Sequence, residues 1–325
     1  MQSWWMRLGD DGAVLEQRVA PMPEPGPQQL LVRVHAASLN RGEFVAGHGL
    51  HGAPGSWKAI GGEGAGEVVK AGPGVTAYRA GDRVMGRCAG AFSEYLLMDV
   101  AEAIPVPGSL TWEEAAGIPL TFLVAFDMLV LQGRLKAGEW MLVNGISSGV
   151  GVSSLQLAKV LGAKVIGTST TAAKLQPLQA LGLDVGICTR AADFAPKVLE
   201  ATDGKGADLV VNAVGGSVFA EDVRCMAFEG RLATVGYVDG VLHADLDLEA
   251  LHAKRLTLFG VSNKLRTKAQ RASPVPRFIA EVLPHFAAGR IRTQVDQVVD
   301  FAQLPQAKAR MEAGGHVGKI VLRMP

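Results

Sequence analysis

The second half of the chain alternates short apolar runs with segments of helical periodicity. Residues 152–161 carry apolar side chains at every third position, which is one face of a helix, and Gly162 follows as a stop signal. Apolar strands that alternate with helices predict a parallel sheet covered on both faces, with right-handed crossovers. The predicted strands are 140–143, 165–167, 208–214, 231–236 and 256–261, and the further predicted helices are 174–181 and 218–228.

The first part of the chain shows strand and turn signals instead. Glycines inside the segment 61–70 indicate bulges or sharp curvature, and residues 71–74 have the composition of a turn. Short strands with frequent turns predict a small barrel or a rolled sheet. A helix is expected after Thr111, which has Glu114 at the capping-box position. The predicted strands are 30–35, 61–70, 82–86 and 92–98.

The tail of the chain is expected to rejoin this first part. It contains a predicted helix over 276–288 and a predicted strand over 318–322. The α/β segment would then be an insertion between two halves of one β-rich domain. The expected fold class is α/β, with boundaries at 1–118 for the first part of the β-rich domain, 119–262 for the α/β domain and 263–325 for the return.

Composition narrows the functional classes. The chain has 325 residues, of which 48% are hydrophobic, so it can bury a large core. Its 32 basic and 31 acidic residues give a net charge of +1, so we expect neither nucleic acid nor a membrane surface as a partner. The apolar stretch 118–131 is too short to span a bilayer and contains Asp127. Three cysteines without CxxC spacing indicate no disulfide framework, and we expect a soluble cytoplasmic protein.

The segment 144–151 has the context of a dinucleotide-binding loop, because it follows a predicted strand and opens a predicted helix. Backbone N–H groups at the helix start would face the pyrophosphate. The usual GxGxxG pattern is not met, since Ile146 and Ser148 occupy its first two glycine positions. The alternative is a glycine-rich turn without a ligand. The candidate contacts are Ser147, Ser148, Gly149, Val150 and Gly151.

The end of the next predicted strand favours NADP over NAD. An NAD site usually has a carboxylate about 20 residues past the loop, bonded to the ribose 2′-hydroxyl. Here three hydroxyl residues, 169–171, follow Thr168, and Lys174 comes one turn into the helix. Ser169 and Lys174 would accept a 2′-phosphate that a carboxylate would repel. The alternative for Lys174 is an ordinary solvated lysine.

Eight segments in order give the chain a family resemblance along essentially its whole length. It resembles the medium-chain dehydrogenase/reductase superfamily, and within it the zinc-lacking quinone oxidoreductase and enoyl reductase branch. The resemblance implies a GroES-like catalytic domain, a Rossmann domain that binds NADP, and a homodimer joined through the Rossmann edge strand, here 256–261. The segments are SLNRGEF (38–44), GGEGAGEVVKAGPGVTAYRAGDRVMG (61–86), AFSEYLLM (91–98), AAGIPLTFLVAF (115–126), ISSGVGVSSLQLAKVLGAKVIGT (146–168), ADLVVNAVGG (207–216), GRLATVGY (230–237) and VGKIVL (317–322).

Zinc-containing relatives carry a GHE motif where this chain has Gly61-Gly62-Glu63, so glycine replaces a histidine ligand. The cysteine expected near Asn40 and the four-cysteine zinc loop are missing as well. A catalytic zinc needs about three protein ligands, and no metal site is therefore expected. His48 and His51 are three residues apart in a glycine-rich loop, which more readily indicates a solvated loop than a metal site.

The resemblance also implies roles for single residues. Asn40 matches an asparagine that zinc-lacking members place near nicotinamide and substrate, where its amide would donate to an oxygen gaining negative charge. The alternative is that Asn40 closes a local turn. Glu43 is expected to orient this loop, and Lys319 to reach the cofactor or to lie on the surface. No residue stands out as a proton donor. The remaining candidate cofactor contacts are Arg190, Asn212, Val214, Gly215, Val235, Gly236, Val261 and Ser262.

The function that follows from the resemblance is an NADPH-dependent, zinc-independent reductase of a quinone or an α,β-unsaturated carbonyl compound. Two alternatives stay open from the sequence. One is a zinc alcohol dehydrogenase, and the other is an NADPH-binding protein without turnover, because a fold alone does not establish catalysis.

Overall fold

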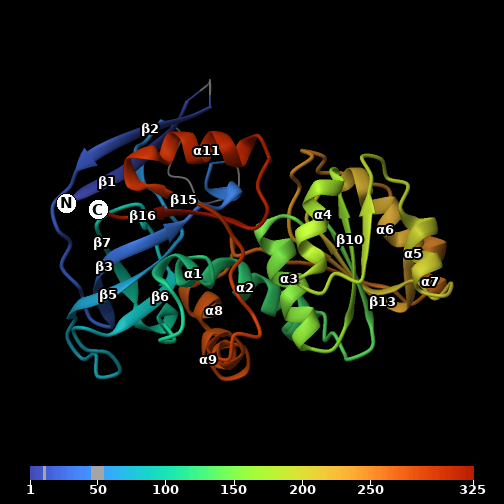
Figure 1. Ribbon diagram of the computed structural model, residues 1–325, viewed down its shortest axis with the longest axis horizontal. Coiled ribbons are helices and arrows are strands. Elements are labelled where there is room, and N and C mark those ends of the chain that lie inside the picture. Colours follow the sequence, from blue (N-terminus) through green and yellow to red (C-terminus); the bar gives the residue numbers. More distant parts are fainter. Residues whose placement is uncertain (10–11, 45–54) are drawn as a thin grey trace. The chain divides into compact units, whose positions relative to one another are not determined.

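The computed structural model describes residues 1–9, 12–44 and 55–325, and it divides into two compact units. Unit 1 comprises Met1–Leu123 and Asn263–Pro325, and unit 2 comprises Val124–Ser262. Both chain termini therefore belong to unit 1, where the blue and red ends of the chain lie (Figure 1). Unit 2 is inserted between the two segments of unit 1.

Unit 1 is built on a seven-stranded sheet with the order β15-β16-β3-β5-β6-β8 and with β7 paired to β3. The C-terminal strand β16 pairs antiparallel with β3, so the tail closes the sheet that the first residues begin. Its strands are β3 (Gln29–Ser38), β5 (Glu63–Ala71), β6 (Arg83–Arg87), β7 (Tyr95–Asp99), β8 (Ile104–Pro105), β15 (Val295–Asp300) and β16 (Lys319–Arg323). A smaller sheet contains β1 (Gln2–Gly9), β2 (Gly12–Val19) and β4 (Lys58–Ala59).

The glycines of β5 have the structural role that the sequence predicted. The pairing of β3 with β5 shifts register twice. At one of these shifts a Cβ on Gly66 would lie 2.0 Å from the carbonyl oxygen of Arg33, so only glycine fits there. The core of unit 1 packs apolar side chains of both chain segments, among them Leu30, Phe92 and Leu322.

Two helices of unit 1, α1 (Trp112–Ala116) and α11 (Leu304–Glu312), pack against this sheet. Thr111 caps α1, with Glu114 completing a capping box as predicted. The single helix predicted over 276–288 is instead two helices, because the chain turns at Val282 and restarts with Pro284 in a first turn. The helical elements that begin in unit 1 are α1 (Trp112–Ala116), α2 (Pro119–Phe126), α8 (Lys268–Ala272), α9 (Val275–Glu281), α10 (Leu283–Ala287), α11 (Leu304–Glu312) and the 3₁₀ turns η1 (Arg41–Glu43), η2 (Val100–Glu102) and η5 (Phe301–Gln303).

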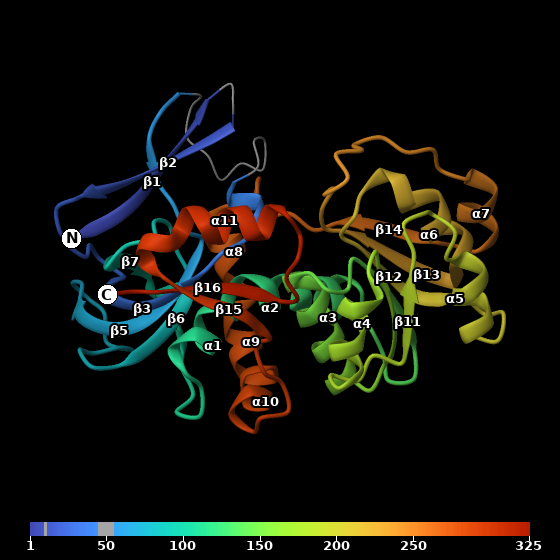
Figure 2. The same cartoon turned by 45° about the horizontal axis from the view of Figure 1, so that its top comes forward.

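Unit 2 is a parallel six-stranded sheet with the order β11-β10-β9-β12-β13-β14, which confirms the predicted Rossmann-type architecture. Figure 2 shows α3 and α4 on one side of the sheet and α5, α6 and α7 on the other. Its elements are η3 (Asp127–Gln132), β9 (Trp140–Asn144), α3 (Gly149–Val160), β10 (Lys164–Ser169), α4 (Ala172–Gln179), β11 (Val185–Cys188), α5 (Ala195–Ala201), β12 (Ala207–Asn212), η4 (Gly216–Val218), α6 (Phe219–Cys225), β13 (Met226–Thr234), α7 (Leu248–Ala253) and β14 (Thr257–Gly260).

Several boundaries in unit 2 differ from the prediction. The helix expected to run to residue 228 ends at Cys225, and β13 begins at once with Met226. The strand β13 ends at Thr234, before the predicted end at residue 236, so Val235 and Gly236 lie in the loop beyond it. Across the described ranges, no helix combines the length and the apolar character needed to cross a membrane.

Candidate functional site

The loop between β9 and α3 has the geometry of a phosphate-binding turn. Gly145 has a φ of +76°, and the Ser148 side chain caps α3 by accepting the N–H of Gly151 at 3.0 Å. A Cβ on Gly151 would lie 2.5 Å from the carbonyl oxygen of Ile146, so a glycine is required for the chain to turn this tightly. The first turn of α3 therefore begins directly at the loop, which suits a pyrophosphate group.

The ends of β10 and β11 bring the candidate 2′-phosphate contacts to one edge of the sheet. Ser169 ends β10 and is in register with Cys188, the last residue of β11. Arg190 is exposed two residues beyond β11, and Lys174 is half-buried in the first turn of α4. No carboxylate occurs from Thr168 to Lys174, so the residues present fit the phosphorylated cofactor.

The loop after β12 is held by one buried side chain. Asn212 accepts the N–H groups of Val214 at 2.9 Å and Gly215 at 2.8 Å, and it donates to the Gly215 carbonyl at 2.9 Å. Gly215 has a φ of +133°, and a Cβ there would lie 2.0 Å from Asp239 Oδ1. Val261 follows β14 and donates its N–H to the Thr234 carbonyl at 2.9 Å, with Ser262 next. The candidate contacts after β12, β13 and β14 thus share the carboxyl edge of the sheet.

Beneath these loops lies a group of polar residues that we call the asparagine cluster: Asn144, Thr168, Asn212 and Asp222. Asn144 ends β9, is in register with Thr168 and Asn212, and donates its side-chain amide to Asp222 Oδ1. Thr168 donates its hydroxyl to Asn144 Oδ1 at 2.8 Å. Burial raises the pKa of Asp222 well above its ordinary value, Asn144 and Asn212 lower it, and the neighbouring Glu221 raises it further.

Unit 1 contains a second buried polar group, the lysine cluster: Ser38, Asn40, Glu43, Glu63 and Lys319. Glu63 is fully buried and Lys319 is only 4% exposed, and their Oε1 and Nζ atoms lie 2.8 Å apart. Lys319 also donates to Asn40 Oδ1 at 2.7 Å and to the Leu39 carbonyl at 3.1 Å. The surface role considered for Lys319 is therefore wrong, because all three of its protons point to partners inside unit 1. Its contact with a cofactor stays a prediction.

Hydrogen bonds engage both the oxygen and the nitrogen of the Asn40 side-chain amide. Its Nδ2 donates to Glu63 Oε1 at 2.9 Å and to Glu43 Oε1 at 3.2 Å, and its side chain stands at the start of η1. The turn-closing alternative therefore describes a contact that exists. Donation to a substrate oxygen stays a prediction, and it would require the amide to leave one of the two carboxyl groups.

Glu43 lies behind Asn40. Its Oε1 also accepts the N–H of Gly62 at 2.8 Å, and its Oε2 accepts the N–H of Asn40 at 3.3 Å. Burial raises the pKa of Glu43 to about 7, against the lowering effects of Asn40 and Lys319. A carboxyl group with a pKa in this range can gain or lose a proton near neutral pH.

The Glu43 carboxyl group occupies the space beside Gly62, where zinc-containing relatives carry a histidine. A Cβ on Gly62 would lie 2.8 Å from Glu43 Oε1, so a larger residue has no room unless Glu43 moves. Glu63, the glutamate of the motif, is occupied by Lys319, Ser38 and the N–H of Leu120. In the parts of the chain that the structure describes, no three metal-ligating side chains gather. His48 and His51 lie outside the described residues.

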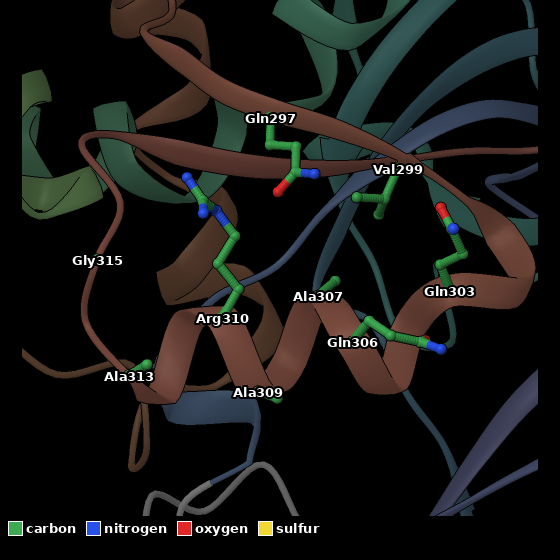
Figure 3. Close-up of a pocket in the computed structure, with 9 residues that line it drawn as sticks. All are labelled: Gln297, Val299, Gln303, Gln306, Ala307, Ala309, Arg310, Ala313 and Gly315. Carbon is green, nitrogen blue, oxygen red and sulfur yellow. The ribbon is translucent and has the colours of Figure 1, made fainter.

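A groove of about 550 Å³ also opens on unit 1, between β15 and α11 (Figure 3). Gln297 and Val299 of β15 face Ala307 and Arg310 of α11 across it. It contains none of the predicted site residues, and the Arg310 guanidinium is already paired with Asp296 at 2.7 Å. The two buried clusters, and not this groove, contain the chemistry that the sequence indicated.

The comparisons with known proteins decide the family. Residues 26–108 match the model of the alcohol dehydrogenase GroES-like domain, and residues 149–275 match the model described as zinc-binding dehydrogenase. The structure of the mycobacterial protein Rv1454c complexed with NADPH is 30% identical, with a TM-score of 0.88 over 99% of this chain and 100% of that one. The chain belongs to the medium-chain dehydrogenase/reductase superfamily.

Two further proteins of known kind are similar to this chain. A quinone oxidoreductase of Pseudomonas syringae pv. tomato DC3000 is 28% identical, with a TM-score of 0.86 over 99% of this chain and 100% of that one. A phenolphthiocerol/phthiocerol polyketide synthase polypeptide of Mycobacterium tuberculosis is 33% identical over 302 residues, 93% of this chain. The chain spans only 14% of the length of that synthase polypeptide. These findings support an oxidoreductase with a GroES-like domain and a Rossmann-type domain.

The sequence had no signal for several members of the two clusters. In the sequence, Glu63 stands out only as part of a motif that lacks its histidine, and no local pattern marks Ser38 or Asp222 as a site residue. Pairing of Glu63 with a lysine near the C-terminus joins positions 256 residues apart, which no local pattern indicates.

Proposed function

We propose that the protein is an NADPH-dependent, zinc-independent oxidoreductase that reduces a quinone or an α,β-unsaturated carbonyl compound. The observation that carries this proposal is the closed arrangement around Gly62. Glu43 fills the space where zinc-containing relatives have a histidine, and Lys319 neutralises Glu63. Both acidic groups are thus engaged by the protein, and activation of a substrate oxygen falls to hydrogen bonding.

The choice of NADPH is supported by the edge formed by β10 and β11. Hydroxyl groups follow Thr168, and Lys174 and Arg190 add two positive charges where an NAD site would carry a carboxylate. The neighbour Rv1454c was solved as a complex with NADPH. When bound, the nicotinamide supplies the hydride.

Asn40 is the residue that we assign to the substrate oxygen. Lys319 and Glu63 hold the oxygen and one N–H of the planar amide, so its second N–H would become available when the Glu43 carboxyl group moves away from it. A proton on Glu43 would weaken the bond that competes for this N–H. Asn40→Ala should then lower kcat and kcat/KM together by about 10²-fold, with NADPH affinity retained. Full kcat in a folded variant would leave Asn40 with its turn-closing role alone.

The decisive assay follows NADPH consumption with quinones, enones and α,β-unsaturated thioesters, each also tested with NADH. The thioesters belong in this panel because a relative forms part of a polyketide synthase. Turnover that is faster with NADPH and unchanged by chelators supports the proposal. One zinc per chain, with activity lost on chelation, would favour the alcohol dehydrogenase alternative, and tight NADPH binding with no turnover would favour a non-catalytic role.

We also propose a cytoplasmic homodimer that forms through β14. This strand is one of the two edges of the Rossmann-type sheet, and the segment that leads to it from β13 exposes apolar residues, with Leu242 at 65% exposure and Leu248 at 69%. Unpaired edge strands readily accept a second strand. Light scattering that gives a mass near that of one chain would rule the dimer out.

A further inference from the structure

The asparagine cluster contains a carboxyl group that the proposed reaction does not use. Asp222 is fully buried on α6. Its Oδ1 accepts the Asn144 amide, while its Oδ2 has no hydrogen-bond partner among the described residues. No cation of the described residues forms an ion pair with it, in contrast to Glu63 and Lys319. A buried carboxyl group without a cation is far more stable as the neutral acid.

The hydrogen-bonded partner of Asp222 holds one loop of the dinucleotide site. Asn144 is the last residue of β9, and through Thr168 it holds the start of the loop that leads to α3, since Gly145 donates to Thr168 Oγ1 at 3.4 Å and Ile146 donates to the Thr168 carbonyl at 3.1 Å. Asn212 closes the loop after β12 with three hydrogen bonds. All three of these bonds stay within that loop, so Asn212 holds it without help from Asp222.

We propose that Asp222 is a positioning residue that fixes, through Asn144, the loop of the dinucleotide site that leads to α3. This inference rests on the proposed binding of NADPH to unit 2. Asn144 is the last residue of β9, and its bond to Asp222 keeps its side-chain amide turned inward. Without it the Asn144 amide would be a buried donor without an acceptor, which a chain avoids by moving the group toward solvent.

Glu221 provides a matched control. It precedes Asp222 on α6 and is also buried, but it accepts the N–H of Ala195 at 2.8 Å and pairs with Arg224. Its contacts therefore concern the start of α5 and not the two loops. Loss of packing on α6 affects both variants, whereas loss of loop positioning affects only one.

The test compares Asp222→Ala and Asp222→Asn with Glu221→Ala by NADPH titration and by hydrogen exchange of the free protein. Asp222→Ala should weaken NADPH binding about 10–100-fold and speed exchange in 144–151 more than in 212–217. Asp222→Asn keeps an acceptor for Asn144 and should bind within about threefold of the parent. Glu221→Ala should leave both loops protected. Infrared spectra of the parent should show the carbonyl stretch of a buried neutral acid, which Asp222→Asn removes.

Several results would overturn the inference. One is unchanged NADPH affinity and loop exchange in folded Asp222→Ala, and another is an equal effect of Glu221→Ala. If Asp222→Ala does not fold, Asn144→Ala removes the same contact from the other side and must give the same losses. If the parent binds no dinucleotide, the proposed function is overturned as well. If the parent binds NADPH and Asp222→Ala binds it equally well, only the inference is rejected.

Discussion

The two units bury carboxyl groups by different means. In the lysine cluster of unit 1, Glu63 is balanced by the ammonium group of Lys319 at 2.8 Å, so a full charge pair is kept out of water. In the asparagine cluster of unit 2, Asp222 faces amides and no cation, and burial raises its pKa. An ion pair of this kind loses much stability when one partner is removed, while a neutral acid loses mainly the orientation of its neighbours. The first cluster should therefore govern stability, and the second the order of its loops.

The largest expected effect breaks the ion pair. Lys319→Met leaves the fully buried Glu63 carboxylate without its cation, and the free energy of unfolding should fall by about 3–5 kcal/mol in urea denaturation. Lys70→Met removes a lysine from an exposed pair with Glu24 and should cost under about 1 kcal/mol. Adding Glu63→Gln to Lys319→Met should restore part of the loss. Equal losses for the two lysines would show that the buried pair has no special weight.

The next effect concerns Glu43, which stands in the lysine cluster without a cation of its own. Its pKa in the folded state is raised from 4.5 to about 7, so its contribution to stability is fully present below pH 4.5 and is lost as pH rises through about 7. Glu43→Gln should remove this decline, which is of the order of 3 kcal/mol. Unfolding free energies of parent and variant across this pH range measure it. A decline of equal size in the variant would assign it to another group.

A smaller effect separates residues that would touch the cofactor from those beneath it. Lys174→Ala should weaken NADPH binding roughly 10–100-fold and leave NADH binding almost unchanged, because a charge-assisted contact to the 2′-phosphate is lost. Isothermal titration with both cofactors measures the ratio. Asp222→Ala should weaken both cofactors alike, so the two variants sharpen the distinction between contact and positioning. Equal loss of NADPH and NADH in Lys174→Ala would assign this residue a structural role.

The smallest effect concerns the cap of α3. Ser148→Ala removes the acceptor for the Gly151 N–H and should lower the free energy of unfolding by about 1 kcal/mol. Thr111→Ala removes the cap of α1 in unit 1 and should cost a similar amount, without any change in NADPH binding. If both variants bind NADPH equally well, the hydroxyl of Ser148 serves the helix and not the cofactor.

What the sequence revealed in advance depended on distance along the chain. The strand–loop–helix segment around Gly151 was predicted because its strand, turn and helix signals lie within about 20 residues. The α/β alternation gave the parallel sheet for the same reason. The asparagine cluster joins Asn144 to Asp222 over 78 residues, and the lysine cluster joins Glu63 to Lys319 over 256. Such pairings follow from sheet register and burial, which single-sequence periodicity does not encode.

The contact between Gly62 and Glu43 has a consequence for how the active centre can change over evolutionary time. A histidine at position 62 would place its Cβ 2.8 Å from Glu43 Oε1, so the buried Glu43 side chain would have to shift before the histidine could act as a zinc ligand. Replacing Glu43 first would leave the Gly62 N–H and the Asn40 amide short of an acceptor. Each single reversal is thus harmful in the presence of the other residue. Positions 43 and 62 would therefore have to change together before a histidine could stand beside Glu63.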